Sequence, residues 1–271
     1  MDHDAKRAEF RRLHESGTFT MPNPHDVGSC RLLTELGFPA LATTSGGFAY
    51  SLGRLDMTVG RDALVAHVAA LAAATHVPLN VDAENCFPDS AGGIAVTVEL
   101  LAEAGAAGCS IEDYDPVTKS ILDRDEAVRR VAVAATAARD TGLVLTARAE
   151  NHLRGVDDVD DTVARLCAYR DAGADVLYAP VLPDTDAIAR VVGETAMPVN
   201  VLLRPGGPSV AELAELGVRR LSVGGTLASV AYGSLYRAAT TLRDDGVLDT
   251  GGATLAGDVV GRAFGEREAA S

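Results

Sequence analysis

Acidic side chains gather at the ends of two short apolar segments. Asp82 and Glu84 lie two residues apart at the end of one segment, and Glu112 ends another. Side chains two residues apart on a strand share a face, so Asp82 and Glu84 are expected to point the same way. Closely spaced carboxylates repel one another unless a cation or a proton lies among them. Because the cluster offers oxygen ligands without a histidine or cysteine group, we predict a Mg²⁺ or Mn²⁺ ion that keeps several water molecules.

The neighbouring acids are open to two interpretations. Asp56 lies on the long segment before Arg61, where it either completes the acidic group or is an ordinary acid at a helix start. Four further acids are typical of helix caps or solvated loop charges: Asp89, Asp113, Asp115 and Asp123. The predicted metal site therefore consists of Asp82, Glu84 and Glu112, with Asp56 as the fourth candidate.

Arg148 follows another apolar segment and supplies the opposite charge. A guanidinium is always protonated and can hold a substrate carboxylate through two parallel hydrogen bonds. The alternative is a structural salt bridge to Glu112 or Glu150. The pattern alone favours neither interpretation.

Other reactive groups are less informative. The pairs Gly206-Gly207 and Gly224-Gly225 either bind phosphate through their N–H groups or simply form turns. The only lysines, Lys6 and Lys119, lie outside the predicted strands, which argues against imine chemistry. Cys86 has acidic surroundings that disfavour its thiolate, so we interpret it as structural.

The elements that position these residues repeat along the chain as a short apolar run, a polar loop and an amphipathic helix. Eight runs are predicted strands: 19–23, 40–44, 78–82, 108–112, 143–147, 174–178, 198–202 and 220–223. The predicted helices between them include 61–74, 94–104, 124–139, 160–171, 186–194 and 209–216. Several helices end in glycine, including one that ends at Leu36-Gly37, and glycine favours a left-handed cap before the next strand.

This alternation predicts an α/β fold, a (βα)8 TIM barrel. An open doubly wound sheet usually has a G-x-G-x-x-G turn after its first strand, whereas this chain has Pro22-Asn-Pro-His-Asp there. The active sites of barrel enzymes lie at the loops after the strands, where the acids and Arg148 fall. We treat residues 1–271 as one barrel domain, with an N-terminal helix within 1–17 and a C-terminal extension over 246–271.

The ends of the barrel have their own predicted helices. Residues 5–15 are predicted to form a helix that carries Phe10 and Leu13 across the barrel floor. Residues 227–242 are predicted to form the eighth helix, and 254–264 one more short helix without a partner of its own.

Composition narrows the class of protein. The 271 residues carry 24 Lys and Arg against 38 Asp and Glu, a formal charge of −14 that argues against nucleic-acid and membrane-surface binding. The four cysteines show no C-x-x-C spacing, which is typical of reduced thiols. Without an apolar leader or a run near 20 apolar residues, we expect a cytoplasmic protein.

The order of these residues resembles the isocitrate lyase and phosphoenolpyruvate mutase superfamily over about residues 8–245. The resemblance rests on Thr44-Ser-Gly46, Asp56, Val81-Asp-Ala-Glu-Asn85, the run ending at Asp113, and Thr146-Ala-Arg-Ala-Glu-Asn151. It implies that Asp82 binds Mg²⁺ directly while Asp56, Glu84 and Glu112 hold its waters. It also implies a homodimer or homotetramer in which the C-terminal helix is exchanged between subunits.

The resemblance further implies a substrate site for a 2-oxo acid. Ser45 and the backbone of Gly46 and Gly47 bind the carboxylate end, with Arg148 on the other side and Asn85 in the substrate wall. Arg148, Ser45 and Glu112 are the predicted catalytic residues. The segment Glu84-Asn-Cys-Phe-Pro88 departs from the Glu-Asn-Gly-Phe-Gly pattern of the superfamily and reshapes that wall.

The loop over 114–123 departs from two familiar chemistries. It lacks the cysteine motif of the isocitrate lyases, and Lys119-Ser120 matches the Lys-x-Asn-Ser loop of the mutases only in part. The remaining groups suit a decarboxylase of oxaloacetate type or a retro-aldol lyase, in which a divalent ion stabilises an enolate. Three alternatives stay open: phosphorus–carbon chemistry, a metal-independent barrel for a phosphorylated metabolite, and a noncatalytic 2-oxo acid binder.

Overall fold

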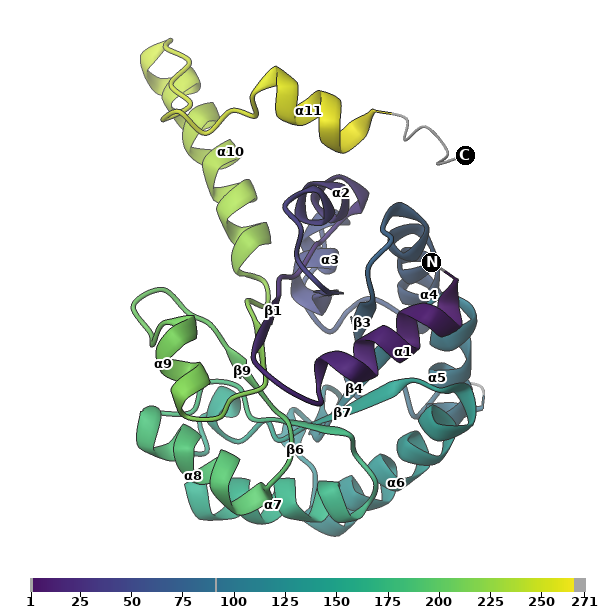
Figure 1. The fold of residues 1–271 in the computed structure, drawn as a ribbon. Coiled ribbons are helices and arrows are strands. Elements are labelled where there is room, and N and C mark those ends of the chain that lie inside the picture. Colours follow the sequence, from purple (N-terminus) through teal and green to yellow (C-terminus); the bar gives the residue numbers. More distant parts are fainter. Residues whose placement is uncertain (1, 91, 266–271) are drawn as a thin grey trace.

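The computed structural model describes residues 2–90 and 92–265, and eight parallel strands form a near-closed barrel at its centre (Figure 1). Neighbouring strands follow the order β1-β10-β9-β8-β7-β4-β3-β2. The Ala42 N–H donates to the Pro22 carbonyl at 3.1 Å and links the two ends of this order. The strands are β1 (Phe19–Met21), β2 (Leu41–Ala42), β3 (Leu79–Asp82), β4 (Gly108–Glu112), β7 (Val144–Arg148), β8 (Val176–Tyr178), β9 (Val199–Leu202) and β10 (Arg220–Ser222). All eight predicted strands are confirmed, and so is the barrel.

Helices cover the outside of the barrel, and the predicted ones are confirmed with ends that differ by a few residues. They are α1 (His3–Leu13), α2 (Val27–Glu35), α3 (Ser45–Ser51), α4 (Arg61–Ala74), α5 (Gly93–Glu103), α6 (Arg124–Thr141), α7 (Val159–Asp171), α8 (Thr185–Thr195), α9 (Val210–Glu215), α10 (Thr226–Asp245) and α11 (Gly257–Phe264). A short 3-10 helix, His152–Arg154, follows β7. In the described residues, no helix is both long and apolar enough to cross a bilayer.

Two segments correct the sequence-based expectations, whereas the helix predicted to end at Leu36-Gly37 is confirmed as α2. The glycine-rich stretch after β2 is the first turn of α3 rather than a loop. Glycine is a poor helix former, but Thr44 caps this helix through the Gly47 N–H, and Phe48 and Ala49 are buried. The predicted loop over 114–123 contains an antiparallel hairpin of β5 (Tyr114–Asp115) and β6 (Ser120–Ile121).

Alternate residues along each strand face the barrel interior. On β7, Leu145 and Ala147 pack against the helices, whereas Thr146 and Arg148 line an internal pocket. Phe10 of α1 is fully buried and packs edge-on against Phe19 below that pocket. The predicted position of α1 across the barrel floor is therefore confirmed.

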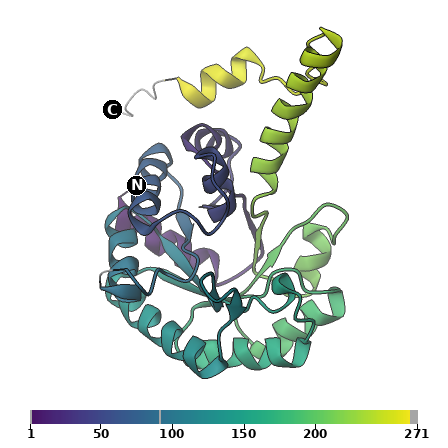
Figure 2. The same ribbon diagram turned by 180° about the vertical axis from the view of Figure 1, so that it is seen from behind.

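The C-terminal helices differ from the rest of the barrel wall. Figures 1 and 2 show α10 extending away from the barrel and α11 lying back over α2. Ala228 is the only buried residue of α10, whereas Leu235 and Tyr236 are 65% and 74% exposed. The predicted exchange of a C-terminal helix between subunits stays a prediction, and residues 266–271 of the predicted extension lie outside the described residues.

Candidate active site

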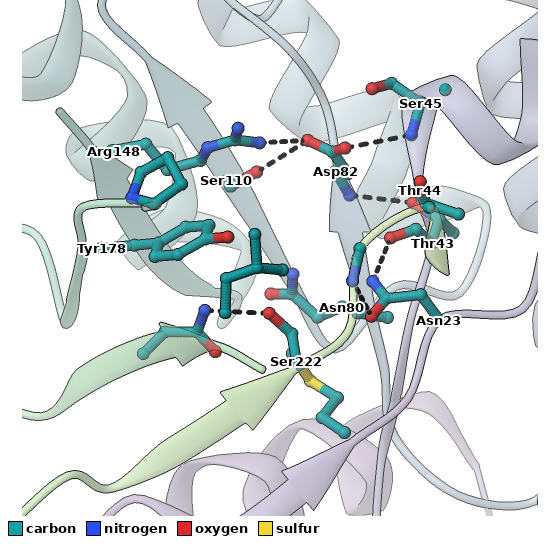
Figure 3. Close-up of a pocket in the computed structure, with 18 of the residues that line it drawn as sticks. Asn23, Thr43, Thr44, Ser45, Asn80, Asp82, Ser110, Arg148, Tyr178 and Ser222 are labelled. Atoms are coloured by element: carbon teal, nitrogen blue, oxygen red, sulfur yellow. Dashed lines mark hydrogen bonds and ion pairs between the residues drawn. The ribbon is translucent and has the colours of Figure 1, made fainter. Parts of the chain in front are cut away.

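A pocket of about 260 Å³ opens at the carboxyl ends of the strands. It reaches from Gly46 and Asp56 at the mouth to Met21 and Arg220 inside the barrel. Figure 3 shows the Arg148 guanidinium paired with the Asp82 carboxylate at the wall of this pocket. Its lining also includes Asn23, Thr43, Thr44, Ser45, Asn80, Ser110, Thr146, Tyr178, Asn200, Leu202 and Ser222.

Arg148 is held by three carboxylates. Its Nη1 contacts Asp82 Oδ1 at 2.7 Å, and its Nη2 contacts Glu150 Oε1 at 2.8 Å and Glu112 Oε2 at 3.3 Å. The Glu150 side chain is fully buried, and burial raises its pKa although Arg148 opposes the rise. The structural salt bridges considered for Arg148 are therefore present, and the same guanidinium lines the pocket.

Asp82 has several partners besides Arg148. Its Oδ2 accepts from the Ser45 N–H at 3.0 Å, and its own N–H donates to Thr43 Oγ1 at 2.8 Å. The Ser110 hydroxyl approaches Asp82 Oδ1 at 3.5 Å. Figure 3 shows these contacts joining strands β3, β4 and β7 to the start of α3. The carboxylate is thus fixed in place at the pocket wall.

The two glutamates near Asp82 carry perturbed pKa values. Burial, together with Asp82 and Asp56, raises the pKa of Glu84 to about 8. Burial and then Glu150 raise the pKa of Glu112 well above its usual range. Within the described residues, Glu112 Oε1 has no hydrogen-bond partner. These acids are destabilised as anions, which is the condition that a nearby cation relieves.

Asp56 and Asp82 line the pocket and Glu84 and Glu112 lie outside its lining, so the four acids do not form a closed set of metal ligands. In residues 2–90 and 92–265, no three His, Cys, Asp or Glu side chains lie close enough together to bind one ion directly. A divalent ion at this site would therefore keep most of its water molecules, because the described residues do not provide a cage of protein ligands.

Five predicted site residues line the pocket, and four do not. Ser45, Gly46, Asp56, Asp82 and Arg148 line it, whereas Gly47, Glu84, Asn85 and Glu112 lie outside its lining. The Gly47 N–H is occupied by Thr44 Oγ1, and a Cβ atom at Gly47 would meet the Thr44 side chain at 2.6 Å. Asn85 Oδ1 accepts from the Phe87 N–H at 3.0 Å, so Asn85 shapes its own loop.

Other expectations have mixed outcomes. Asp123 caps α6 as predicted. Asp113, in contrast, is buried and accepts from Tyr169 Oη at 2.6 Å and Arg165 Nη1 at 3.2 Å, so its interpretation as a solvated loop charge was wrong. Cys86 is buried with its thiol toward the Ser110 carbonyl at 3.4 Å, which agrees with a structural role.

The glycine pairs are only partly available to an anion. The Gly207 N–H donates to the Arg204 carbonyl at 3.0 Å, and the Gly224 N–H donates to Asn23 Oδ1 at 2.9 Å. These contacts favour the interpretation of the pairs as turns.

The polar lining of the inner half of the pocket was not predicted from the sequence. Asn80, Tyr178, Asn200, Arg220 and Ser222 lie on four different strands and line the same space. Each of them is a polar residue at an inward position of an otherwise apolar strand. This pattern predicts a pocket residue only when the inward face of each strand is known.

Comparisons with known proteins agree with this architecture. The family model described as phosphoenolpyruvate phosphomutase matches residues 10–243. The crystal structure of a lyase/mutase candidate from Burkholderia cenocepacia is 48% identical, with a TM-score of 0.92 over 97% of each chain. An uncharacterized protein from Mycobacterium tuberculosis is 36% identical over 238 residues, which are 86% of this chain and 87% of that protein. A protein named as a probable 2-methylisocitrate lyase from Corynebacterium glutamicum is 32% identical over 221 residues, 79% of this chain and 68% of its own.

Proposed function

Because the chain belongs to the phosphoenolpyruvate phosphomutase family, within the isocitrate lyase and phosphoenolpyruvate mutase superfamily, we propose that it is a magnesium-dependent lyase or decarboxylase. Its substrate is a small 2-oxo or 2-hydroxy acid in which a carbon–carbon bond is cleaved. One observation carries this proposal: Asp82, Arg148 and the Ser45 N–H meet at one pocket of about 260 Å³.

The acids fit a hydrated magnesium ion. Asp82 would bind it directly, and Asp56, Glu84 and Glu112 would hold its water molecules. The bound ion supplies positive charge that stabilises an enolate as it forms. The raised pKa of Glu84 supports this assignment, because burial and the neighbouring Asp82 and Asp56 disfavour its anion and a bound cation would favour it.

The chain's own residues bind and orient the acid. Arg148 can exchange one of its three carboxylate partners for the substrate carboxylate, while Glu150 keeps its guanidinium in place. At the start of α3, the Ser45 N–H donates to Asp82 Oδ2 and holds that carboxylate at the pocket wall. Burial raises the pKa of Tyr178 to about 12, so its hydroxyl keeps its proton at neutral pH and can donate a hydrogen bond.

The direct test is a panel of 2-oxo and 2-hydroxy diacids assayed for pyruvate release with magnesium and with a chelator. We expect release only with magnesium, and Asp82→Ala should lose both turnover and magnesium dependence. The matched control is Asp89→Ala, which removes an exposed acid outside the pocket. Full activity in the chelated protein would refute the mechanism.

Phosphorus–carbon chemistry is the second candidate, because the matching family model carries a mutase description. Phosphonopyruvate followed by phosphorus NMR distinguishes it: conversion of that compound would replace the carbon–carbon assignment. A noncatalytic binder would bind oxalate with magnesium and turn over nothing in the panel.

We further propose that the protein is a homodimer or homotetramer. Leu235 and Tyr236 expose large apolar side chains on α10, which extends from the barrel in Figure 2. Apolar patches of this kind mark subunit interfaces. Light scattering coupled to gel filtration should give a mass above one chain, and Leu235→Glu should lower it.

A further inference from the structure

A buried arginine crosses the barrel interior below the pocket. Arg220 starts β10, is 2% exposed and lines the pocket. Its Nε donates to Asn200 Oδ1 on β9, and its Nη2 donates to Thr146 Oγ1 on β7, both at 2.9 Å. Because β9 and β8 lie between β10 and β7 in the sheet, the side chain reaches across the barrel instead of along its wall.

The third partner of Arg220 is also neutral. His14 Nδ1 bonds to the Phe10 carbonyl at 2.7 Å, so that nitrogen carries the proton and Nε2 accepts from Arg220 Nη1 at 3.3 Å. Burial and then the Arg220 charge lower the pKa of His14 to about 3, so the ring is uncharged at neutral pH. In the described part of the chain, no carboxylate forms an ion pair with Arg220.

A structural role alone does not account for a charge at this position. The interiors of TIM barrels are commonly filled by Val, Ile and Leu. A buried cation without an anionic partner is destabilising, since desolvation is not repaid by an ion pair. A guanidinium carries five N–H donors, and the three contacts above leave two of them for a ligand.

We propose that Arg220 binds the second carboxylate of the substrate at the floor of the pocket. This inference rests on the proposed function and names its substrate class, which is a 2-oxo or 2-hydroxy dicarboxylate rather than a monocarboxylate. Arg148 is already paired with three acids, whereas the partners of Arg220 among the described residues are all uncharged. Asn80 and Ser222, below Asp82 in Figure 3, continue the polar lining toward this floor.

Two variants separate binding from folding. Arg220→Met removes the charge and keeps a long side chain. Asn200→Asp keeps the shape and supplies Arg220 with a built-in carboxylate, because Asn200 Oδ1 already accepts from its Nε. If Arg220 has only a structural role, Asn200→Asp should raise the midpoint of thermal unfolding and leave ligand binding unchanged. If Arg220 binds the substrate, Asn200→Asp should have an equal or higher midpoint of thermal unfolding and a lower affinity for the dicarboxylate.

The control is Arg219→Met. Arg219 precedes Arg220 and binds the Gly17 carbonyl, and it does not line the pocket. The probes are 3,3-difluorooxaloacetate, a dicarboxylate, and pyruvate, a monocarboxylate. Each is titrated by calorimetry with magnesium and with a chelator. We expect Arg220→Met and Asn200→Asp to weaken difluorooxaloacetate about 10- to 100-fold, the scale of a charge-assisted hydrogen bond, and pyruvate less than threefold.

The titrations distinguish failure of the Arg220 subsite from failure of the magnesium function. If both variants keep the parent ratio of the two affinities, the Arg220 subsite is wrong while the magnesium function stands. If the affinities do not depend on magnesium but both variants still bind the dicarboxylate more weakly, the Arg220 subsite is supported and the magnesium function is wrong. A parent protein that binds neither probe in either buffer overturns both.

Discussion

Arg148 and Arg220 line one pocket but have opposite surroundings. Arg148 lies among Asp82, Glu112 and Glu150, whereas Arg220 contacts only Asn200, Thr146 and His14. The acidic wall around Arg148 therefore carries excess negative charge, which suits a cation, and the floor around Arg220 carries excess positive charge, which suits an anion. The two arginines are the same residue type, so the roles that we propose for them differ only because the charges of their neighbours differ.

The largest loss of stability should come from removing the Arg148 charge among Asp82, Glu112 and Glu150. In Arg148→Met, Asp82 and the buried Glu112 and Glu150 lose their common cation, and removing one partner from a buried ion pair costs about 3–5 kcal/mol. We expect a loss of that size in the free energy of unfolding, measured by urea denaturation in a chelating buffer, together with loss of turnover. Arg154→Met is the control: its longer contacts with Glu112 and Glu150, 3.8 and 3.6 Å, predict a smaller loss. Equal losses in the two variants would contradict the central position of Arg148.

The stability of the protein should depend on pH through His14, which contacts Arg220 at the floor of the pocket. The pKa of His14 is lowered to about 3 in the folded protein from an ordinary value of 6.5, so the unfolded chain binds more protons between these values. Stability from this group is therefore complete above about pH 6.5 and falls as the pH drops toward 3, by at most about 1.4 kcal/mol per unit. His14→Gln keeps an acceptor for Arg220 without taking up a proton.

Unfolding free energies measured from pH 4.5 to 6.5 should therefore fall less steeply on acidification for His14→Gln than for the parent. The exposed His3, replaced by Gln, serves as the control and should leave the slope unchanged. Parallel curves for parent and His14→Gln would show that the floor holds no uncharged histidine.

The smallest effect should come from the residue between the two regions. The Tyr178 ring lies 5.2 Å from the Arg148 guanidinium carbon, and its backbone pairs in register with both Arg148 and Asn200. Tyr178→Phe keeps the ring and removes the hydrogen bond between its hydroxyl and the Ser222 side chain, which should lower the free energy of unfolding by about 1 kcal/mol. Tyr50→Phe, on the half-exposed rim, should change it by less than about 0.5 kcal/mol. A Tyr178→Phe protein as stable as the parent would mean that the hydroxyl has no partner.

The acidic wall was largely predictable because its residues follow strand ends. Asp82, Glu112 and Arg148 stand at the ends of three apolar runs, and the carboxyl ends of parallel strands meet at one face of a barrel. The same reasoning misplaced the Ser45 segment, since two glycines hide a helix start that the Thr44 cap and buried Phe48 establish. It also misjudged Asp113, whose partners Tyr169 and Arg165 come from a distant helix.

The sequence by itself determined the repeat of strand and helix, and with it the barrel and the mouth at which the acids collect. This follows because apolar periodicity and glycine caps are local properties of the chain. Only the tertiary structure decided which polar residues share the interior, since Arg220, Thr146 and His14 come from distant parts of the chain. Barrel closure brings them together, and the balance of charge that distinguishes the pocket wall from its floor exists only after that closure.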